Sequence, residues 1–215
     1  MLMEKIRPVQ TEYKGYLFRS RLEARWAVFF DACGVDWEYE PEGYDLGNGI
    51  HYLPDFLLKR VQLGGYGSGS EFSEIRSLYV EVKGQMTQAD SEKILAFYKA
   101  GLADGLPAIS DTPVLVLGDI PPGTTLDRMR SWVDAESGRP FPWGARAFHS
   151  GTVDGMDCTA FPCVNREGYL ELFGQAEEYN RRFIDRRATE RAYRLARQAR
   201  FEHGETPKVR RARYA

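Results

Sequence analysis

Cysteine and histidine are scarce in this sequence, and long apolar runs are missing from it. Each of the two residue types occurs three times, and an odd number of cysteines does not form the disulfide framework of a small secreted protein. No apolar run approaches the roughly 20 residues that span a bilayer, and the N-terminal segment MLMEKIRPVQTEYKGY lacks the apolar core of a secretory signal. We therefore expect a reduced, cytoplasmic setting and no contact with a membrane.

Net charge is also low, at −2, but it is distributed unevenly. From Tyr179 to Ala215 the chain has 12 Lys and Arg against 4 Asp and Glu, whereas the remainder has 17 against 27. An acidic body with a basic tail indicates a polyanionic partner, although exposed helices are often basic for solubility alone. Arg187, Arg191 and Arg194 are candidates for contacts with the phosphates of a nucleic acid. The alternative is a helix that packs on the domain or on a second subunit.

The spacing of apolar residues predicts an α/β domain in residues 1–122, with the order helix, three strands, helix, strand. Ser20 is expected to cap the first helix and Gly34 to end it. The strands are expected in VDWEYEP, in HYLPDFLLKR and at 78–83, the second helix from Thr87 or Asp90 to about Ala100, and the last strand in TPVLVLGDIPPG.

Two further regions follow this domain, which suits a chain of 215 residues. Residues 123–168 are rich in glycine, proline and aromatic residues, and we expect them to be irregular. From about Tyr169 a helical spacing of apolar residues, with arginines on the other faces, predicts a basic C-terminal helix and tail over residues 169–215.

Charged side chains occupy positions where a simple α/β fold would place apolar ones. Glu81 and Lys83 share one face of the strand at 78–83, and Asp55 shares a strand face with leucines in YLPDFLL. Glu23 flanks the apolar stripe of the first helix and should be partly buried. If the two strands pair, these side chains converge at one end of the sheet.

Such a cluster is suited to phosphodiester hydrolysis. Carboxylates that face one another repel, which raises their pKa unless a cation intervenes. Oxygen ligands without clustered His or Cys select a hard cation such as Mg²⁺ or Mn²⁺, which polarises a phosphoryl oxygen and activates a bound water. An adjacent lysine can position that water or stabilise the charge that grows on phosphorus.

The residues Pro54-Asp55 followed by Glu81-Val82-Lys83 resemble the P-D…(D/E)-x-K motif of the PD-(D/E)XK nucleases. The order of elements is similar to that family's core, in which the Asp lies on the second strand and the E-x-K on the third. The stretch FRSRLEARWAVFFDACGVDWEYEP…YLPDF…VEVKG resembles most the small bacteriophage- and mobile-element-associated members, over residues 12–120. The resemblance implies a restriction-endonuclease-like core, a mixed sheet flanked by helices, with a C-terminal helical extension.

The resemblance also implies roles for individual residues. Asp55 and Glu81 would bind the divalent metal directly, with the carbonyl of Val82 as a further ligand. Glu23 corresponds to an acidic residue that many members carry on the first helix, and it would complete the metal shell directly or through water. Lys83 would orient the attacking water.

Several other residues are weaker candidates. Gln85 and Lys93 are candidates for substrate contacts, but a polar strand end is an equally ordinary interpretation of Gln85, and a solvated helix lysine is the favoured interpretation of Lys93. His149, Cys158 and Cys163 are zinc-ligand types whose spacing fits no standard zinc pattern.

These patterns together predict an Mg²⁺- or Mn²⁺-dependent deoxyribonuclease, an endonuclease because nothing in the sequence indicates an element that grips a DNA end. We expect it in the cytoplasm of a prokaryotic or phage-infected cell, acting on DNA as a homodimer or within a larger nucleic-acid-processing complex. The alternatives are a non-catalytic nucleic-acid-binding module on the same fold and an accessory subunit of a recombination machine.

Overall fold

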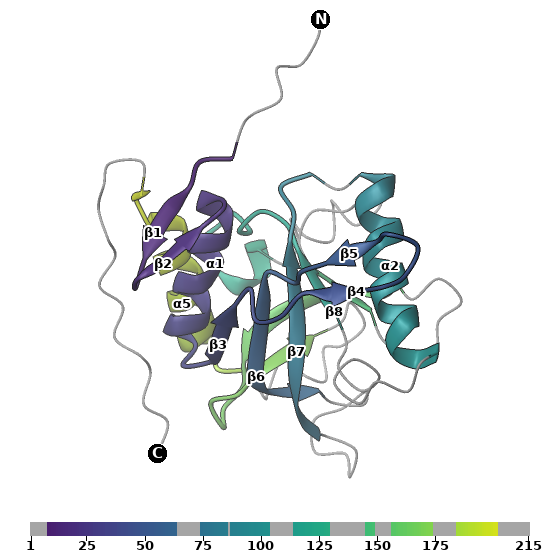
Figure 1. Cartoon of the computed structure of the whole chain (residues 1–215). Helices are drawn as coiled ribbons and strands as arrows, with labels where there is room; N and C mark the ends of the chain where they lie inside the picture. The colour runs from purple at the N-terminus through teal and green to yellow at the C-terminus, as the bar shows by residue number, and fades with distance from the viewer. Residues whose placement is uncertain are drawn as a thin grey trace, which may run out of the picture.

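The computed structural model of the chain is a mixed α/β protein in which helices flank a curled sheet (Figure 1). It describes residues 8–63, 74–85, 87–103, 114–129, 145–148, 156–173 and 184–201. The strands are β1 (Thr11–Tyr13), β2 (Tyr16–Phe18), β3 (Asp36–Tyr39), β4 (Tyr44–Asp45), β5 (His51–Tyr52), β6 (Phe56–Leu63), β7 (Glu74–Val82), β8 (Val114–Leu117), β9 (Ala145–Phe148), β10 (Met156–Val164) and β11 (Leu170–Phe173). The helices are α1 (Arg21–Ala32), α2 (Gln88–Ala103) and α5 (Arg186–Gln198).

Within the described residues the main sheet has the strand order β11-β10-β9-β8-β7-β6-β3. β6 is antiparallel to its neighbours β3 and β7, whereas β7 and β8 run parallel, with Val80 opposite Leu115. A parallel pair needs a crossover connection, and α2 lies in the chain between these two strands. The predicted order of helix, three strands, helix and strand is present as α1, β3, β6, β7, α2 and β8.

The sheet curls until β11 pairs with β6 through Glu171 and Gln62. An extra residue in β6 shifts its register against β7 between Leu58 and Val61. In this bulge Arg60 has a φ of 60°, a left-handed conformation that is uncommon outside glycine. A bulge increases the local twist of a strand, and it therefore helps β6 to turn towards β11.

Helix α1 begins and ends where the sequence predicts. The Ser20 side chain accepts a hydrogen bond from the backbone N–H of Glu23, which satisfies a donor that the first turn leaves open. Gly34 follows the helix with a φ of 74°, the left-handed conformation that a residue without Cβ adopts at little cost. At the start of α2, the side chains of Thr87 and Asp90 each accept a hydrogen bond from the backbone N–H of the other residue.

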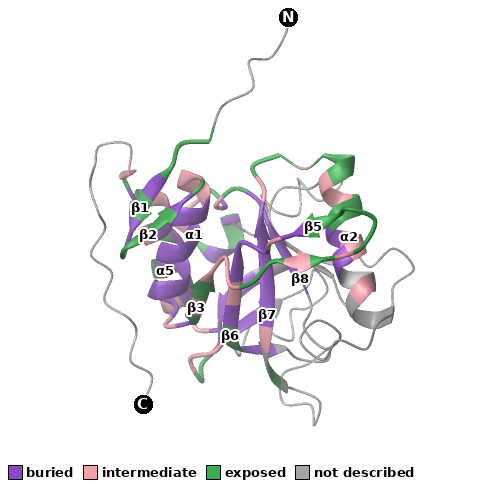
Figure 2. Ribbon diagram, in the orientation of Figure 1, coloured by how far each residue is buried: buried purple, intermediate pink, exposed green. Residues whose placement is uncertain are grey.

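The main apolar core lies between one face of the sheet and the pair α1 and α5, which lie side by side (Figures 1 and 2). Leu78, Val80 and Val82 of β7 are buried in it. Trp26 of α1 donates from its indole N–H to the Gly118 carbonyl at 2.8 Å, which ties the helix to the end of β8. Burial of these aromatic and aliphatic side chains is the main favourable contribution to the stability of this half of the molecule.

A smaller apolar cluster lies on the opposite face of the sheet, under α2. Its buried members are Tyr52, Tyr79, Ile94, Phe97, Val114 and Val116. The rings of Tyr52 and Phe97 lie 4.4 Å apart between their centroids, so the aromatic contact joins β5 to α2.

One strand predicted over HYLPDFLLKR is divided in the structure. β5 pairs with β4 in a hairpin, and β6 begins only at Phe56. Proline lacks the N–H that a ladder requires, so Pro54 separates the two strands. At the hairpin turn Gly47, Asn48 and Gly49 all have positive φ values, which agrees with the turn that GNG predicts.

The region after residue 122 differs most from expectation. Residues 123–168 are predicted to be irregular, but β9 and β10 extend the sheet there. A helix is predicted from about Tyr169, whereas Leu170–Phe173 form strand β11 and helix α5 begins at Arg186. β11 pairs with the end of β10, whereas the helical spacing behind the prediction, that of Ala188, Ala192 and Leu195, belongs to the later helix α5.

None of the helices in the described ranges combines the length and the apolar content that crossing a bilayer demands.

Candidate functional site

Asp55 and Glu81 come together at one end of the β6–β7 pair. The register places Phe56 opposite Val80, and one further step along both strands places Asp55 opposite Glu81. Directly opposite residues point to the same face of a sheet, here the face that α2 covers. Both residues are 4% exposed, so the pairing brings two carboxylates into a largely desolvated position, as the sequence predicts.

The Asp55 carboxylate is held through both of its oxygens. Oδ2 accepts a hydrogen bond of 2.7 Å from the backbone N–H of Val82, and Oδ1 lies 3.2 Å from Nη2 of Arg19. The backbone carbonyl of Asp55 accepts from Glu40 N at 2.9 Å. The aspartate thus fixes the end of β7 to the segment before α1.

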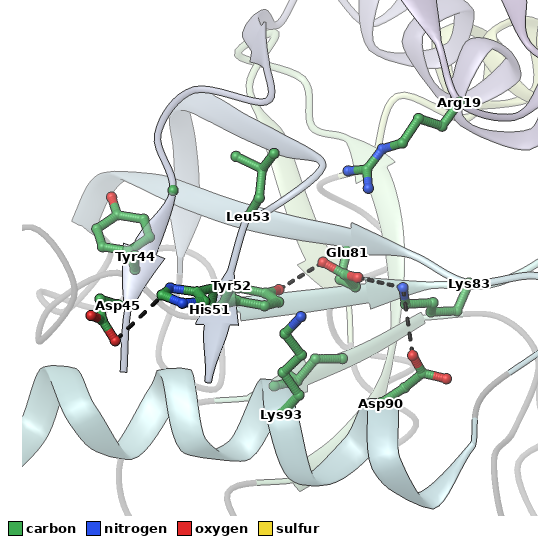
Figure 3. Close-up of a pocket in the computed structure, with 12 residues that line it drawn as sticks. Arg19, Tyr44, Asp45, His51, Tyr52, Leu53, Glu81, Lys83, Asp90 and Lys93 are labelled. Carbon is green, nitrogen blue, oxygen red and sulfur yellow. Dashed lines mark hydrogen bonds and ion pairs between the residues drawn. The ribbon is translucent and has the colours of Figure 1, made fainter. Parts of the chain in front are cut away.

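Glu81 lies at the centre of a second chain of polar contacts (Figure 3). Tyr52 donates its hydroxyl to Glu81 Oε2 at 2.7 Å, and Lys83 Nζ lies 2.7 Å from Oε1. Lys83 also lies 3.7 Å from Asp90 Oδ1 at the start of α2. The lysine backbone N–H donates to the Leu117 carbonyl, so β8 fixes where its side chain leaves the sheet.

The ionisation of this cluster follows from burial and from the neighbouring charges. Burial raises the pKa of Asp55 well above its ordinary value of 3.8, and the carboxylates of Glu81 and Glu23 raise it further. Burial lowers the pKa of Lys83, but Glu81, Asp55 and Asp90 outweigh that effect and the net shift is upwards. Lys83 is therefore a cation at neutral pH, beside carboxylates whose negative charge a further cation would stabilise.

Glu23 is buried, as predicted, but its carboxylate belongs to the start of α1. Oε1 accepts from the Ser20 hydroxyl at 2.6 Å, and Oε2 accepts from the Tyr39 hydroxyl at 2.7 Å and from Arg19 N at 3.1 Å. The side chain influences the pKa of Asp55 through its charge, whereas its hydrogen bonds are structural. A role for Glu23 in the metal shell stays a prediction.

An open pocket of about 490 Å³ lies beside Glu81 and Lys83 (Figure 3). The β4–β5 hairpin forms one wall, and the first turns of α2 form another. Arg19 enters it from the segment before α1, and Lys93 extends towards it from α2. The pocket is large enough for one nucleotide unit, and cationic side chains on three sides suit a phosphate-bearing ligand.

The two weaker candidates differ in position. Lys93 lines the pocket and is exposed, whereas Gln85 is exposed and is not among the lining residues. Glu40 is half-buried, and its Oε1 lies 2.6 Å from Nε of Arg19. The prediction of a substrate contact is thus better placed at Lys93 than at Gln85.

The structure places the three candidate arginines of helix α5 away from this site. Arg187, Arg191 and Arg194 are exposed on α5, which packs with α1 on the sheet face opposite the pocket. The inner face of α5 contributes buried Ala192 and Tyr193 to the core. The helix therefore packs on the domain, which is the alternative that the sequence left open, and its removal would damage the fold.

Sequence reasoning missed two residues that contact the cluster, Arg19 and Tyr52. Arg19 lies outside any regular element, and Tyr52 looked like an ordinary aromatic residue of an apolar strand. A local signal existed for Tyr52, because Pro54 two residues later breaks the strand and turns Tyr52 towards Glu81. No comparable signal existed for Arg19, whose role depends on contacts with residues far along the chain.

Of the three candidate zinc ligands, the structure describes the side chain of Cys163. Cys163 is a buried thiol of β10, while His149 and the side chain of Cys158 lie outside the described residues. Over the described part of the chain, no three His, Cys, Asp or Glu side chains are grouped so that they alone could hold a metal ion.

The donor set at Asp55 and Glu81 nevertheless fits a hard cation that keeps part of its water shell. Mg²⁺ is commonly bound through one or two carboxylates while waters complete its octahedron. Each of these carboxylates accepts two contacts from the protein, and a carboxylate has about four lone-pair sites. Oxygen sites therefore remain for a cation between two carboxylates that otherwise repel each other.

Comparison of the chain with models of protein families, with curated proteins and with solved structures finds no match among any of them. The case for a function therefore depends on the arrangement of the side chains in this site.

Proposed function

We propose that this protein is an Mg²⁺- or Mn²⁺-dependent DNA nuclease, acting as an endonuclease on internal phosphodiester bonds. The observation that carries the proposal is the meeting of Asp55, Glu81 and protonated Lys83 beside an open pocket that Arg19 and Lys93 also line. The order α1, β3, β6, β7, α2, β8 supports it, because it is similar to the core of the PD-(D/E)XK nucleases.

Asp55 and Glu81 would hold the divalent cation, together with the carbonyl of Val82. When bound, such a cation polarises a phosphoryl oxygen and lowers the pKa of a coordinated water. Tyr52 donates to Glu81 Oε2 and so fixes the orientation of that carboxylate. Lys83 is a compact positive charge that can hold the attacking water by a hydrogen bond and stabilise the charge that develops on the phosphate.

The pocket supports a substrate that carries phosphate rather than a neutral one. Lys83, Lys93 and Arg19 present positive charge to it from the sheet, from α2 and from the segment before α1. Phosphate contacts of this kind position a nucleic acid without reading its sequence. The proposal therefore includes no sequence specificity.

The direct test is a cleavage panel of supercoiled, linear, single-stranded and branched DNA with Mg²⁺ or Mn²⁺. We expect the wild-type protein to nick the supercoiled plasmid, EDTA to stop the reaction, and Asp55→Asn to lose about 100-fold or more in rate. Asp45→Asn is the matched control, because Asp45 lines the same pocket with a side chain that is 68% exposed. It should cut at close to the wild-type rate.

Two outcomes would contradict the proposal. Folded wild-type protein that leaves all four DNA forms intact with either metal is not a nuclease, and retarded migration of those DNAs in a gel would then support the binding module. Equal cleavage by wild type and Asp55→Asn would show that the activity does not come from this site.

A further inference from the structure

Arg19 connects the acidic residues of the site. Its Nε lies 2.6 Å from Glu40 Oε1, and its Nη2 lies 3.2 Å from Asp55 Oδ1. Its backbone N–H donates to Glu23 Oε2 and to the Tyr39 hydroxyl. A single residue before α1 thus contacts three carboxylates, and its side chain also lines the pocket.

The contact with Asp55 places a protein cation on an oxygen that a metal would use. Asp55 Oδ2 is occupied by the backbone N–H of Val82, which belongs to the strand and cannot leave without breaking its end. Oδ1 is contacted instead by Arg19, a side chain that is 53% exposed. Two cations on one carboxylate oxygen repel each other, so a metal at Oδ1 would compete with the guanidinium.

Arg19 has an alternative position if it leaves Asp55. The guanidinium has five N–H donors in a planar fork, more than its contacts with Glu40, Asp55 and the Tyr39 hydroxyl use. Such a fork matches the oxygens of a phosphate, and the side chain already lines the pocket that holds Lys83.

We propose that Arg19 guards Asp55: it competes with the divalent cation for Oδ1 and, once displaced, binds a phosphate of the nucleic acid in the pocket. This inference rests on the proposed nuclease function. It assigns Arg19 opposite effects on the two ligands, since the guanidinium weakens metal binding in the free protein and strengthens substrate binding afterwards. A residue that served only to cap α1 or to stabilise the fold would not separate the two effects in this way.

The test compares Arg19→Met with wild type. Methionine keeps an apolar stem and removes the charge, and the backbone N–H of residue 19 remains. In isothermal titration calorimetry with Mn²⁺ and no DNA, we expect the variant to bind the metal about 3-fold more tightly or better, because an ion pair with one exposed partner is lost. In plasmid nicking with saturating Mn²⁺, its KM for DNA should rise about 10-fold, because a charged phosphate contact is lost.

Arg186→Met is the matched control. Arg186 also pairs with a carboxylate, with Nη2 at 2.7 Å from Asp127 Oδ2, and its side chain is 43% exposed. It lies on α5, on the far side of the sheet from the pocket. We expect wild-type metal affinity and KM from this control. Arg19→Lys keeps the charge without the fork and should give metal affinity near wild type with a raised KM.

The outcomes separate this inference from the proposed function. One outcome is that wild type binds Mn²⁺ and nicks the plasmid while Arg19→Met binds the metal no more tightly. That result would contradict the competition between Arg19 and the metal but would leave the proposed nuclease function supported. Tighter metal binding with an unchanged KM would contradict the phosphate contact. If Arg19→Met does not fold, Arg19→Lys with an unchanged KM overturns the inference. If folded wild type neither binds Mn²⁺ nor cuts DNA, both proposals fail.

Discussion

The two faces of β7 carry different kinds of side chain although they alternate along one strand. Leu78 and Val80 are fully buried and Val82 is 6% exposed on the face that α1 and α5 cover (Figure 2). Tyr79, Glu81 and Lys83 point to the other face, where α2 leaves the pocket open. The first face has apolar neighbours, whereas the second brings carboxylates together under partial burial.

Under the proposed function, the side chains that stabilise the fold and those that would take part in catalysis alternate along one strand. Apolar burial on the first face stabilises the fold in proportion to the area removed from water. Buried carboxylates on the second face cost free energy, because desolvation and mutual repulsion act against their charged forms. Substitutions at neighbouring positions of this strand should therefore affect the rate of DNA cleavage and the free energy of unfolding to different extents.

The largest expected effect is on catalysis. Lys83→Met removes the cation that lies 2.7 Å from Glu81 Oε1 while it keeps a side chain of similar length. We expect a fall of about 10²- to 10³-fold in the rate of plasmid nicking, because a preorganised charge at the phosphate is lost. Urea unfolding should show a lower midpoint as well, because the buried Glu81 carboxylate loses this cation, so the rates are compared under conditions in which both proteins are folded. Nicking at the wild-type rate would remove Lys83 from the mechanism.

The second largest effect is a loss of stability, caused by a substitution on the opposite face of β7. Leu78→Ala leaves a cavity at a residue that is fully buried in the main core, and should lower the free energy of unfolding by about 2–5 kcal/mol. Ile75→Ala is the matched control, because Ile75 lies on β7 with 49% of its surface exposed. The control should change the free energy by less than about 0.5 kcal/mol. Urea denaturation measures both, and equal losses would contradict the assignment of the core face.

A smaller change in the free energy of unfolding, a gain rather than a loss, is expected when Asp55 is replaced. The raised pKa of Asp55 means that the folded state binds its proton more tightly than the unfolded state does. Stability should therefore fall as the pH rises from about 3.8, the ordinary value, through the raised one. Asp55→Asn removes this penalty, so in EDTA at neutral pH it should be about 1–2 kcal/mol more stable than wild type.

The pH dependence gives the control for that prediction. Near pH 3.8 the wild-type Asp55 is protonated in the folded state and resembles an amide in charge, so the stability difference should disappear. Asp45→Asn, at an exposed position, should match wild type at both pH values. A stability advantage of Asp55→Asn that did not depend on pH would show that charge burial is not its cause.

Much of this comparison could be predicted from the sequence, because alternation and caps are local. The spacing of Leu78, Val80 and Val82 against Glu81 and Lys83 places the two sets on opposite faces without any knowledge of neighbours. The signals of Ser20 and Gly34 at the ends of α1 are equally local, and the structure confirms them.

The parts that failed depend on partners that are distant in the sequence. Strand β11 pairs with β10 and, through Glu171 and Gln62, with β6 from a distant part of the chain. Arg19 contacts Asp55, which lies 36 positions later in the chain, so no pattern of neighbouring residues predicts this contact. Tyr52 donates to Glu81 across 29 positions of the chain.

The smallest expected effect concerns the exposed arginines of α5. Replacing Arg187, Arg191 and Arg194 together by glutamine keeps helix propensity and removes three charges from the face that points away from the core. Because α5 lies across the sheet from the pocket, we expect plasmid nicking to change by less than about 3-fold and the salt dependence of DNA binding to stay the same. Each phosphate contact contributes about 0.9 to the slope of log affinity against log salt. A slope reduced by about that amount per arginine would mean that the nucleic acid continues from the pocket around to α5, and the division between a chemical and a structural face would then fail at this helix.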